Sequence, residues 1–272
     1  MLSHTPSKPR LQKPILKVAA AVTAGLMAAF GPSPATANVR PHCHGHRATI
    51  VGNRQPNHIV GTRRSDVIVG FGGDDYIKGG GGDDTICGSG GHDYLGGARG
   101  DDFLVGGHGG DILKGSKNRD ILVGDVATTG ARTARGGARD RLYGESGRDI
   151  VIGDSYSSRG RARGGGNDIL NAGFKNDLVV GDSYTRSGLA SGGGKDHLHG
   201  LWGNDYLYGD DFASRTAGRI QRHDGGRDLL AGADGDDHLD GGMRHDLCAG
   251  GPGRDSDRRC EVRLDIEHHW GR

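Results

Sequence analysis

Two consecutive nonapeptides, GGGGDDTIC at 79–87 and GSGGHDYLG at 88–96, contain the pattern that decides the fold of this chain. Each begins with glycine-rich residues, has aspartate at its sixth position and has an aliphatic residue at its eighth. The same frame, G-G-x-G-x-D-x-U-x with U aliphatic, recurs through most of the sequence. A fixed short period of this kind is typical of a solenoid, in which each repeat stacks on its neighbours.

The eighth position is aliphatic throughout the regular part of the pattern. Its residues are Ile68, Ile77, Ile86, Leu95, Leu104, Leu113, Leu122, Leu142, Val151, Leu170, Val179, Leu198, Leu207, Leu230 and Leu239. Because side chains alternate across a strand, x-U-x predicts a very short strand with its middle residue inward. The preceding glycines predict a turn, since glycine tolerates positive φ. We therefore predict an all-β parallel β-roll, with two nonapeptides per coil and two parallel sheets enclosing one aliphatic layer.

The ends of the array are degenerate. Ile50 and Ile59 continue the register upstream, and 52–60 has Asn57 in place of the aspartate. We expect 38–51 to form an N-terminal segment and cap, because solenoids need covered ends. Asp257 occupies the inward position of the last repeat. We therefore expect the β-roll to span 52–258 and 259–272 to be a tail.

Composition supports a thin repetitive fold. The chain has 54 glycines and 33% hydrophobic residues, so a thick apolar core is excluded. Of its 34 acidic residues only three are glutamate, which leaves 34 − 3 = 31 aspartates. This bias indicates carboxylates held close to the backbone, as in turns and metal-binding loops. A disordered chain would not need the strict period.

Residues 1–37 have the pattern of a secretory signal peptide. Basic residues are followed by an apolar stretch, 18–30, that is too short to span a bilayer, and Ala35-Thr36-Ala37 is a small-x-small cleavage site. We expect a secreted, extracellular protein; an anchored N-terminal helix is the alternative. No other segment resembles a membrane span.

The four cysteines are consistent with an oxidising compartment. An even number in an exported chain favours disulfides. Cys248 and Cys260 are close in sequence, which leaves Cys43 to pair with Cys87. Three connectivities are possible, and we favour this one. No CxxC pair is present to suggest a four-cysteine zinc site.

The nonapeptides resemble the hemolysin-type calcium-binding repeats of RTX proteins over roughly residues 52–258. The resemblance implies a parallel β-roll that binds several Ca²⁺ ions between consecutive turns, through aspartate side chains and backbone carbonyls. The expected ligands are Asp66, Asp75, Asp84, Asp93, Asp102, Asp111, Asp120, Asp149, Asp177, Asp205 and Asp237, with turn residues Gly72, Gly79, Gly81, Gly88, Gly90 and Gly106.

Elementary electrostatics favours the same ion. Turns one coil apart stack at about 4.8 Å. Two carboxylates at that distance repel by about 3–4 kcal/mol at an effective dielectric constant near 20. Calcium accepts six to eight hard oxygens in irregular geometry, which suits carbonyl-rich turns. We expect the chain to be largely unfolded without calcium. Because Arg64 and Asn118 replace the fourth-position glycine, the sites that use their turns are doubtful.

The aspartate spacing breaks at 120→140, 149→168, 177→196 and 205→228, with steps of nine between the breaks. The four insertions, at about 125–135, 154–163, 182–191 and 210–223, must therefore lie on one edge. Each opens with Gly-Asp. The aspartates, Asp125, Asp154, Asp182 and Asp210, are predicted to form an additional cation column. The alternative is that each only caps a local turn.

The insertions are also rich in arginine, at Arg132, Arg135, Arg159, Arg161, Arg163, Arg186, Arg215, Arg219 and Arg222. Guanidinium groups bind anionic polymers, so a cell-surface adhesion or polymer-binding module is our alternative function. The same arginines could instead neutralise the aspartates beside them. No aromatic residues are interleaved, which argues against specific nucleic-acid binding.

We expect no enzymatic activity. GDSY, at 153–156 and 181–184, begins with the same Gly-Asp-Ser sequence as the SGNH-type esterases. It occurs twice in the repeat register, however, and no strand-to-helix nucleophile turn follows it. HExxH is absent. A lyase or epimerase built on a repeat scaffold is the remaining enzymatic alternative. Histidines at 42, 44, 46, 268 and 269 could hold a transition metal, although solvated tails are more common.

Overall fold

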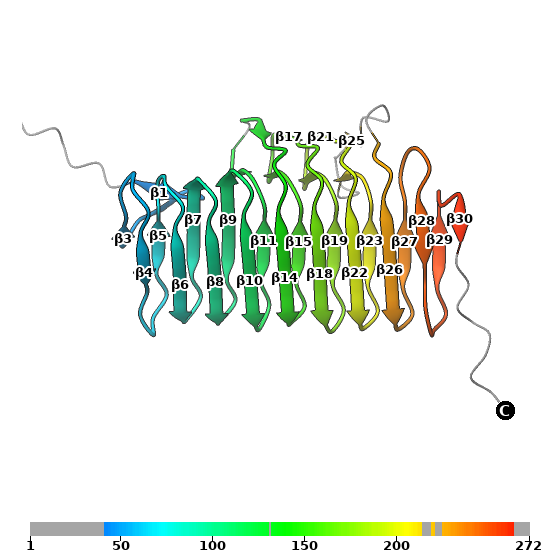
Figure 1. The fold of residues 1–272 in the computed structure, drawn as a ribbon, viewed down its shortest axis with the longest axis horizontal. Coiled ribbons are helices and arrows are strands. Elements are labelled where there is room, and N and C mark those ends of the chain that lie inside the picture. Colours follow the sequence, from blue (N-terminus) through cyan, green and yellow to red (C-terminus); the bar gives the residue numbers. More distant parts are fainter. Residues whose placement is uncertain (1–40, 131, 214–218, 221–224, 264–272) are drawn as a thin grey trace, which may run out of the picture. The chain divides into compact units, whose positions relative to one another are not determined.

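The computed structural model describes residues 41–263, except for residues 131, 214–218 and 221–224. The expected signal peptide at 1–37 and most of the expected tail lie outside these residues. Every regular element described is a β-strand, and no described helix is long and apolar enough to cross a membrane. The fold is the all-β parallel roll predicted from the repeat (Figure 1).

Two ten-stranded parallel sheets form the roll, and the chain alternates between them at each nonapeptide. The first sheet contains β3 (Ile50–Val51), β5 (Val67–Val69), β7 (Thr85–Gly90), β9 (Phe103–His108), β11 (Ile121–Val123), β15 (Ile150–Ile152), β19 (Leu178–Val180), β23 (Tyr206–Tyr208), β27 (His238–Asp240) and β29 (Ser256–Arg258). The second contains β4 (His58–Val60), β6 (Tyr76–Gly81), β8 (Tyr94–Arg99), β10 (Ile112–Lys117), β14 (Arg141–Ser146), β18 (Ile169–Phe174), β22 (His197–Trp202), β26 (Leu229–Asp234), β28 (Leu247–Ala249) and β30 (Val262–Arg263).

The core is one aliphatic layer between the sheets. All fifteen eighth-position residues named above are fully buried, from Ile68 to Leu239. Each pairs in register with its counterpart one coil away, as Leu113 does with Leu95 and Leu142. The insertion between 120 and 140 therefore leaves the strand register unchanged, because its residues leave and re-enter the roll at the same edge.

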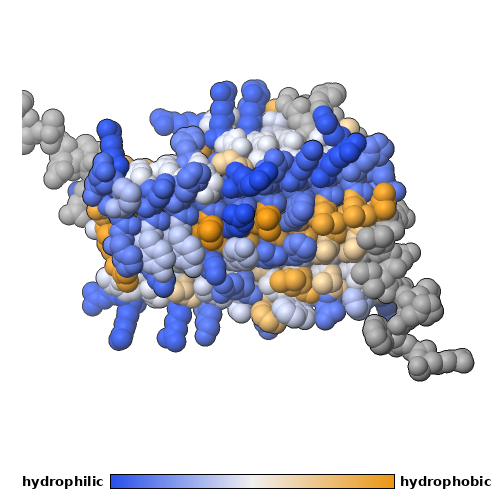
Figure 2. Space-filling view, in the orientation of Figure 1, coloured by the Kyte–Doolittle hydropathy of each residue, from blue (hydrophilic) through white to orange (hydrophobic). Residues whose placement is uncertain are grey.

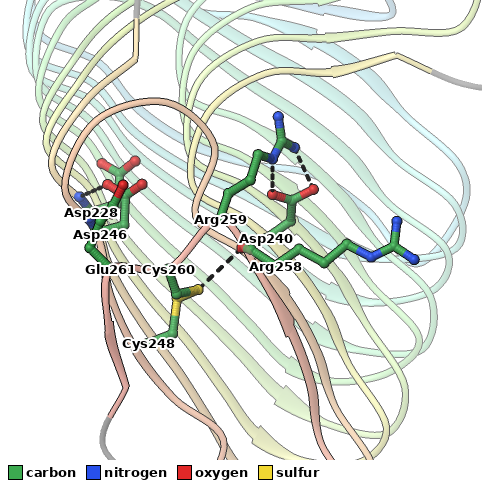
Figure 3. The surroundings of a disulfide bond; sticks show 8 residues. All are labelled: Asp228, Asp240, Asp246, Cys248, Arg258, Arg259, Cys260 and Glu261. Carbon is green, nitrogen blue, oxygen red and sulfur yellow. Dashed lines mark hydrogen bonds and ion pairs between the residues drawn. A yellow bond between two sulfur atoms is a disulfide. The ribbon is translucent and has the colours of Figure 1, made fainter.

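The roll extends slightly further than the sequence suggests. β3 pairs with β5, so the first sheet begins at Ile50. Beyond Asp257, β30 pairs with β28, and the expected tail contributes one more strand. The Cys248–Cys260 disulfide ties this segment to β28, which explains why the chain continues past an inward carboxylate (Figure 3).

The other disulfide closes the first end. A hairpin of β1 (His42–Cys43) and β2 (His46–Arg47) is joined to β7 through Cys43–Cys87, with Cα atoms 5.8 Å apart. Cys43 is buried with Ala48 and Val69. The two bridges are the pairs that the sequence favours, one near each end of the array.

The insertions form two further parallel sheets along one edge, the upper edge in Figure 1. One sheet contains β12 (Ala127–Thr128), β16 (Tyr156–Ser157), β20 (Tyr184–Thr185) and β24 (Phe212–Ala213). The other contains β13 (Ala134–Arg135), β17 (Arg161–Arg163), β21 (Leu189–Ser191) and β25 (Arg219–Ile220). Tyr156, Tyr184 and Phe212 stack in sequence with ring centroids 5.5 Å apart. The insertions thus extend the solenoid sideways as ordered structure.

We predict that removing the Cys43–Cys87 bridge lowers stability more than removing Cys248–Cys260. The bridges close segments with sequence separations of 44 and 12 residues. Loop-closure entropy gives losses of about 4 and about 3 kcal/mol respectively. Urea unfolding of calcium-loaded paired Cys→Ser variants measures both. A larger loss for the Cys248/Cys260 pair would contradict the expectation.

Candidate metal centres

The sixth-position aspartates form two columns, one along each edge of the roll. The plain-edge column contains Asp66, Asp84, Asp102, Asp120, Asp149, Asp177, Asp205, Asp237 and Asp255. The looped-edge column contains Asp75, Asp93, Asp111, Asp140, Asp168, Asp196, Asp228 and Asp246. Within each column, Oδ1 accepts a hydrogen bond from the aspartate amide of the preceding coil, for example at 2.8 Å between Asp84 N and Asp102 Oδ1.

The second carboxylate oxygen of most of these aspartates has no hydrogen-bond partner among the described residues. Such Oδ2 atoms belong to Asp75, Asp84, Asp93, Asp102, Asp111, Asp120, Asp140, Asp149, Asp168, Asp177, Asp196, Asp205, Asp228, Asp237 and Asp246. All of these side chains are buried. Buried polar atoms are almost always satisfied, so rows of partnerless oxygens indicate a missing cation or proton.

Backbone oxygens complete the donor set. In the uninterrupted turns from Asp75 to Asp120 the fourth position has positive φ, as at Gly91 and Gly100. A Cβ at either glycine would overlap the carbonyl oxygen of the equivalent glycine one coil earlier, Gly73 or Gly82. Turn carbonyls therefore face the narrow space between coils. In the described chain no three His, Cys, Asp or Glu side chains gather as a metal site. Carboxylate and carbonyl oxygens together fit calcium, a hard cation with a high coordination number.

The turn glycines expected as ligands occupy two different environments. At Gly79, Gly88 and Gly106, a Cβ would overlap Oδ2 of the aspartate in the same turn, so the carboxylate itself requires glycine there. At Gly72, Gly81 and Gly90, a Cβ would meet only backbone atoms of neighbouring coils, at the ordinary contact distance of 3.6–3.9 Å. The first-position glycines are thus a steric requirement of the buried carboxylates.

The Asp66 turn differs from the others. Thr62 donates to Asp66 Oδ2 from its amide at 2.7 Å and from its hydroxyl at 2.8 Å. Arg64 is also not among the residues with positive φ, whereas Gly82 and Gly100 have positive φ at the same position of the next two plain-edge turns. This turn therefore offers no free carboxylate oxygen, in line with the doubt that Arg64 raises.

The Asn118 turn keeps the regular geometry. Asn118 adopts φ 81°, and Lys175 adopts φ 90° at the same position of a later turn. Asparagine tolerates this left-handed conformation, whereas lysine does so at a cost of about 1–2 kcal/mol. Oδ2 of both Asp120 and Asp177 remains partnerless. Replacing the fourth-position glycine thus leaves the buried carboxylate oxygen of the turn without a hydrogen-bond partner among the described residues.

At its two ends, the looped-edge column is bounded by residues other than aspartate. At its start, Asn57 donates to Asp75 Oδ1 from its amide at 2.8 Å and from Nδ2 at 2.7 Å. At its end, Glu261 accepts from the Asp246 amide at 2.6 Å (Figure 3). In the degenerate repeat 52–60, an amide in place of a carboxylate therefore begins the column without adding another negative charge.

Burial dominates the electrostatics of both columns. Desolvation, with added repulsion from neighbouring aspartates, raises the pKa of Asp102 to about 7 and that of Asp111 to about 9. On the looped edge it raises the pKa of Asp140 to about 8. Hydrogen bonds from the preceding amides oppose these shifts but do not cancel them. Without metal, many of these carboxyls retain protons near neutral pH.

The insertion aspartates form a third buried column beside the looped edge. Asp125, Asp154, Asp182 and Asp210 accept hydrogen bonds from amides of the turns that follow their insertions, as Asp182 Oδ1 does from Gly194 at 2.8 Å. Oδ2 of Asp182 has no partner. Desolvation, and then the charge of Asp168, raises the pKa of Asp154 well above its ordinary value. Turn capping thus accounts for only part of their bonding capacity.

The insertion arginines do not pair with these aspartates in the described residues. The described ion pairs are Lys114–Glu145 at 3.9 Å, Arg119–Asp101 at 3.7 Å and Arg259–Asp240, the last drawn in Figure 3. None joins an insertion arginine to an aspartate. The side chains of Arg215, Arg219 and Arg222 lie outside the description. Of the N-terminal histidines, His44 stacks on Phe103 at 4.2 Å, and residues 268–269 are not described.

Stacked Gly-Asp turns between parallel strands define a β-roll with oxygen-rich cation sites. The family model for the RTX calcium-binding nonapeptide repeat matches residues 51–86, 60–95, 96–126, 136–155, 164–183, 189–214 and 224–257. The chain belongs to this family, whose repeats bind Ca²⁺. No curated protein and no solved structure matched the chain.

We predict that acid stabilises the calcium-free roll. The folded-state pKa of Asp102 is about 7 and that of Asp111 about 9, both above the unfolded value of about 3.8. Stability is therefore fully present below about pH 4 and is lost as pH rises towards 9. Circular dichroism in chelator should show more β-structure at pH 5 than at pH 8. More structure at pH 8 would contradict the assigned burial.

Proposed function

We propose that this chain is an exported protein whose β-roll folds when calcium binds between its stacked turns. Family membership implies a calcium-binding roll, and the proposal adds the coupling to folding. The observation that carries it is the pair of buried columns with partnerless Oδ2 atoms. A buried carboxylate that lacks a partner must bind a proton or a cation, or else destabilise the fold.

Calcium supplies the missing positive charge at neutral pH. The core is a single aliphatic layer, and the turns contain many glycines whose ordering costs conformational entropy. Metal binding becomes folding free energy when the site exists only in the folded state. The ligands that we propose are the aspartates of the regular turns from Asp75 to Asp120, together with Asp149, Asp177, Asp205 and Asp237. Asp66 contributes least, because Thr62 already satisfies its Oδ2.

We propose that the insertion aspartates bind cations as well. Asp154 and Asp182 are fully buried, and the buried hydroxyls of Ser155 and Ser183 beside them have no hydrogen-bond partner among the described residues. These oxygens add to the looped-edge column and make a second row of hard ligands. Calorimetric titration of the Asp154→Asn and Asp182→Asn chains should give fewer bound calcium ions. An unchanged number would assign these aspartates to turn capping alone.

The same serines support a non-enzymatic role. Ser155 and Ser183 are the hydroxyl residues of the two GDSY motifs, and both are fully buried beneath the insertions. A nucleophile must reach its substrate, so these positions do not suit an esterase. We infer a structural and binding role for the roll.

Calcium titration of the chelated chain should show a large, reversible gain of β-structure by circular dichroism. Asp102→Asn should raise the calcium midpoint by about tenfold, a magnitude typical of changes at metal sites. Asp101→Asn is the matched control, because it removes the same charge from an exposed neighbouring position. A chain equally folded in excess chelator would refute the coupling, and equal effects of the two variants would refute the ligand assignment.

Export accounts for both the metal and the disulfides. Two disulfides suit an oxidising compartment, where free calcium is also plentiful. Mass spectrometry of the chain recovered from culture medium should show Asn38 as the first residue, following cleavage after Ala37. A cell-retained chain that still contains residues 1–37 would contradict this.

A further inference from the structure

A basic groove of about 910 Å³ lies on the looped edge of the roll, over the insertions. Its charged lining residues are Arg135, Arg163, Lys195, Arg227 and Arg244, here called the basic row. The remaining described lining residues are glycines and Ser191, so none of the described residues lining the groove is acidic or aromatic. Figure 2 shows a strongly hydrophilic surface along the edge that bears the insertions.

The basic row follows the axis of the roll. Its residues come one each from five successive coils. Arg135 and Arg163 end the first two insertions, whereas Lys195, Arg227 and Arg244 lie in the turns before Asp196, Asp228 and Asp246. Arg135 and Arg163 are in-register neighbours of β13 and β17. Coils are spaced by about 4.8 Å, so the row presents positive charge over roughly 20 Å. A compact anion would contact only part of it, whereas a linear polyanion could contact all of it.

These cations have no carboxylate partner within the described chain. None of the three described ion pairs involves the basic row. Nε of Arg163 is buried, and no described residue accepts a hydrogen bond from it. Arg244 occupies a fourth turn position at φ 87°, a conformation that is costly for a long side chain. Parallel like charges repel each other, and a bound anion would offset that repulsion.

The buried aspartates lie directly behind the groove. A Cβ at Gly164 or Gly192 would overlap the side chain of Asp154 or Asp182. The groove glycines therefore separate a row of carboxylates from a row of cations. When calcium fills the aspartate column, its charge offsets the carboxylates and leaves the basic row free to attract an external anion.

We propose that the basic row is a binding site for a linear acidic polysaccharide, one that presents carboxylate or sulfate groups along its length. Arginine forms paired hydrogen bonds with such groups. The lack of aromatic lining argues against single-stranded nucleic acid, which needs rings on which its bases stack. The site requires the folded roll and therefore rests on the proposed function. Its ligand, however, is distinct from the calcium that the turns are proposed to bind.

The test uses the calcium-loaded full chain and short oligogalacturonates as the probe. Arg163→Gln, Lys195→Gln and Arg227→Gln are combined in one groove variant. Arg119→Gln, Arg148→Gln and Arg254→Gln form the matched control, because they remove the same charge from exposed positions on the plain edge. Circular dichroism with calcium first establishes that each chain is folded, so a folding failure is distinguished from a binding failure.

The groove variant should bind the probe at least about tenfold more weakly, with a shallower dependence on salt, while the control stays close to the original chain. Carboxylated and sulfated oligosaccharides distinguish the two ligand chemistries. If the groove variant and the control lose the same affinity for the probe, net charge alone accounts for binding and the proposal is overturned. Failure of the folded chain to bind, or tighter groove binding of single-stranded DNA or polyphosphate, would overturn it as well.

Discussion

The structure depends on one constraint, the stacking of identical carboxylates out of water at the spacing of one coil. Each Oδ1 is held by an amide of the preceding coil, which fixes the register and brings the next carboxylate close. At about 4.8 Å two such charges repel by about 3–4 kcal/mol at an effective dielectric constant near 20. Protons or cations must offset this repulsion in every coil, so ion binding and the fold are inseparable.

Several features of the chain follow from that constraint. Glycine is required at the first turn position because Oδ2 occupies the space of a side chain, as at Gly79 beside Asp84. The looped-edge column begins at an asparagine, whose side chain donates a hydrogen bond where the side chain of another aspartate would repel. Insertions are tolerated on one edge because the chain returns to the same coil register. There they add a third carboxylate column, and its glycine cover forms the floor of the basic groove.

The nonapeptide period was sufficient to predict the parallel roll, its aliphatic layer and the separation of plain and looped edges, because all three are consequences of register. The period could not show which hydrogen bonds the aspartate of an individual turn accepts. That Thr62 satisfies Asp66 depends on a side chain at one degenerate position. The insertion strands were missed because they are only two or three residues long, although aromatic residues at 156, 184 and 212 recur at a constant offset from Gly-Asp. The basic row combines residues from different turn positions, so no sequence period reveals it.

The central claim is that cations lie between successive turns, beside the partnerless carboxylate oxygens. The most direct measurement is a crystal structure of the calcium-loaded chain with anomalous scattering used to locate calcium. The account predicts rows of calcium peaks along both edges, next to residues such as Asp93 and Asp102, and none beside the Thr62-bonded Oδ2 of Asp66. A folded roll at neutral pH with no peaks along either column would contradict it.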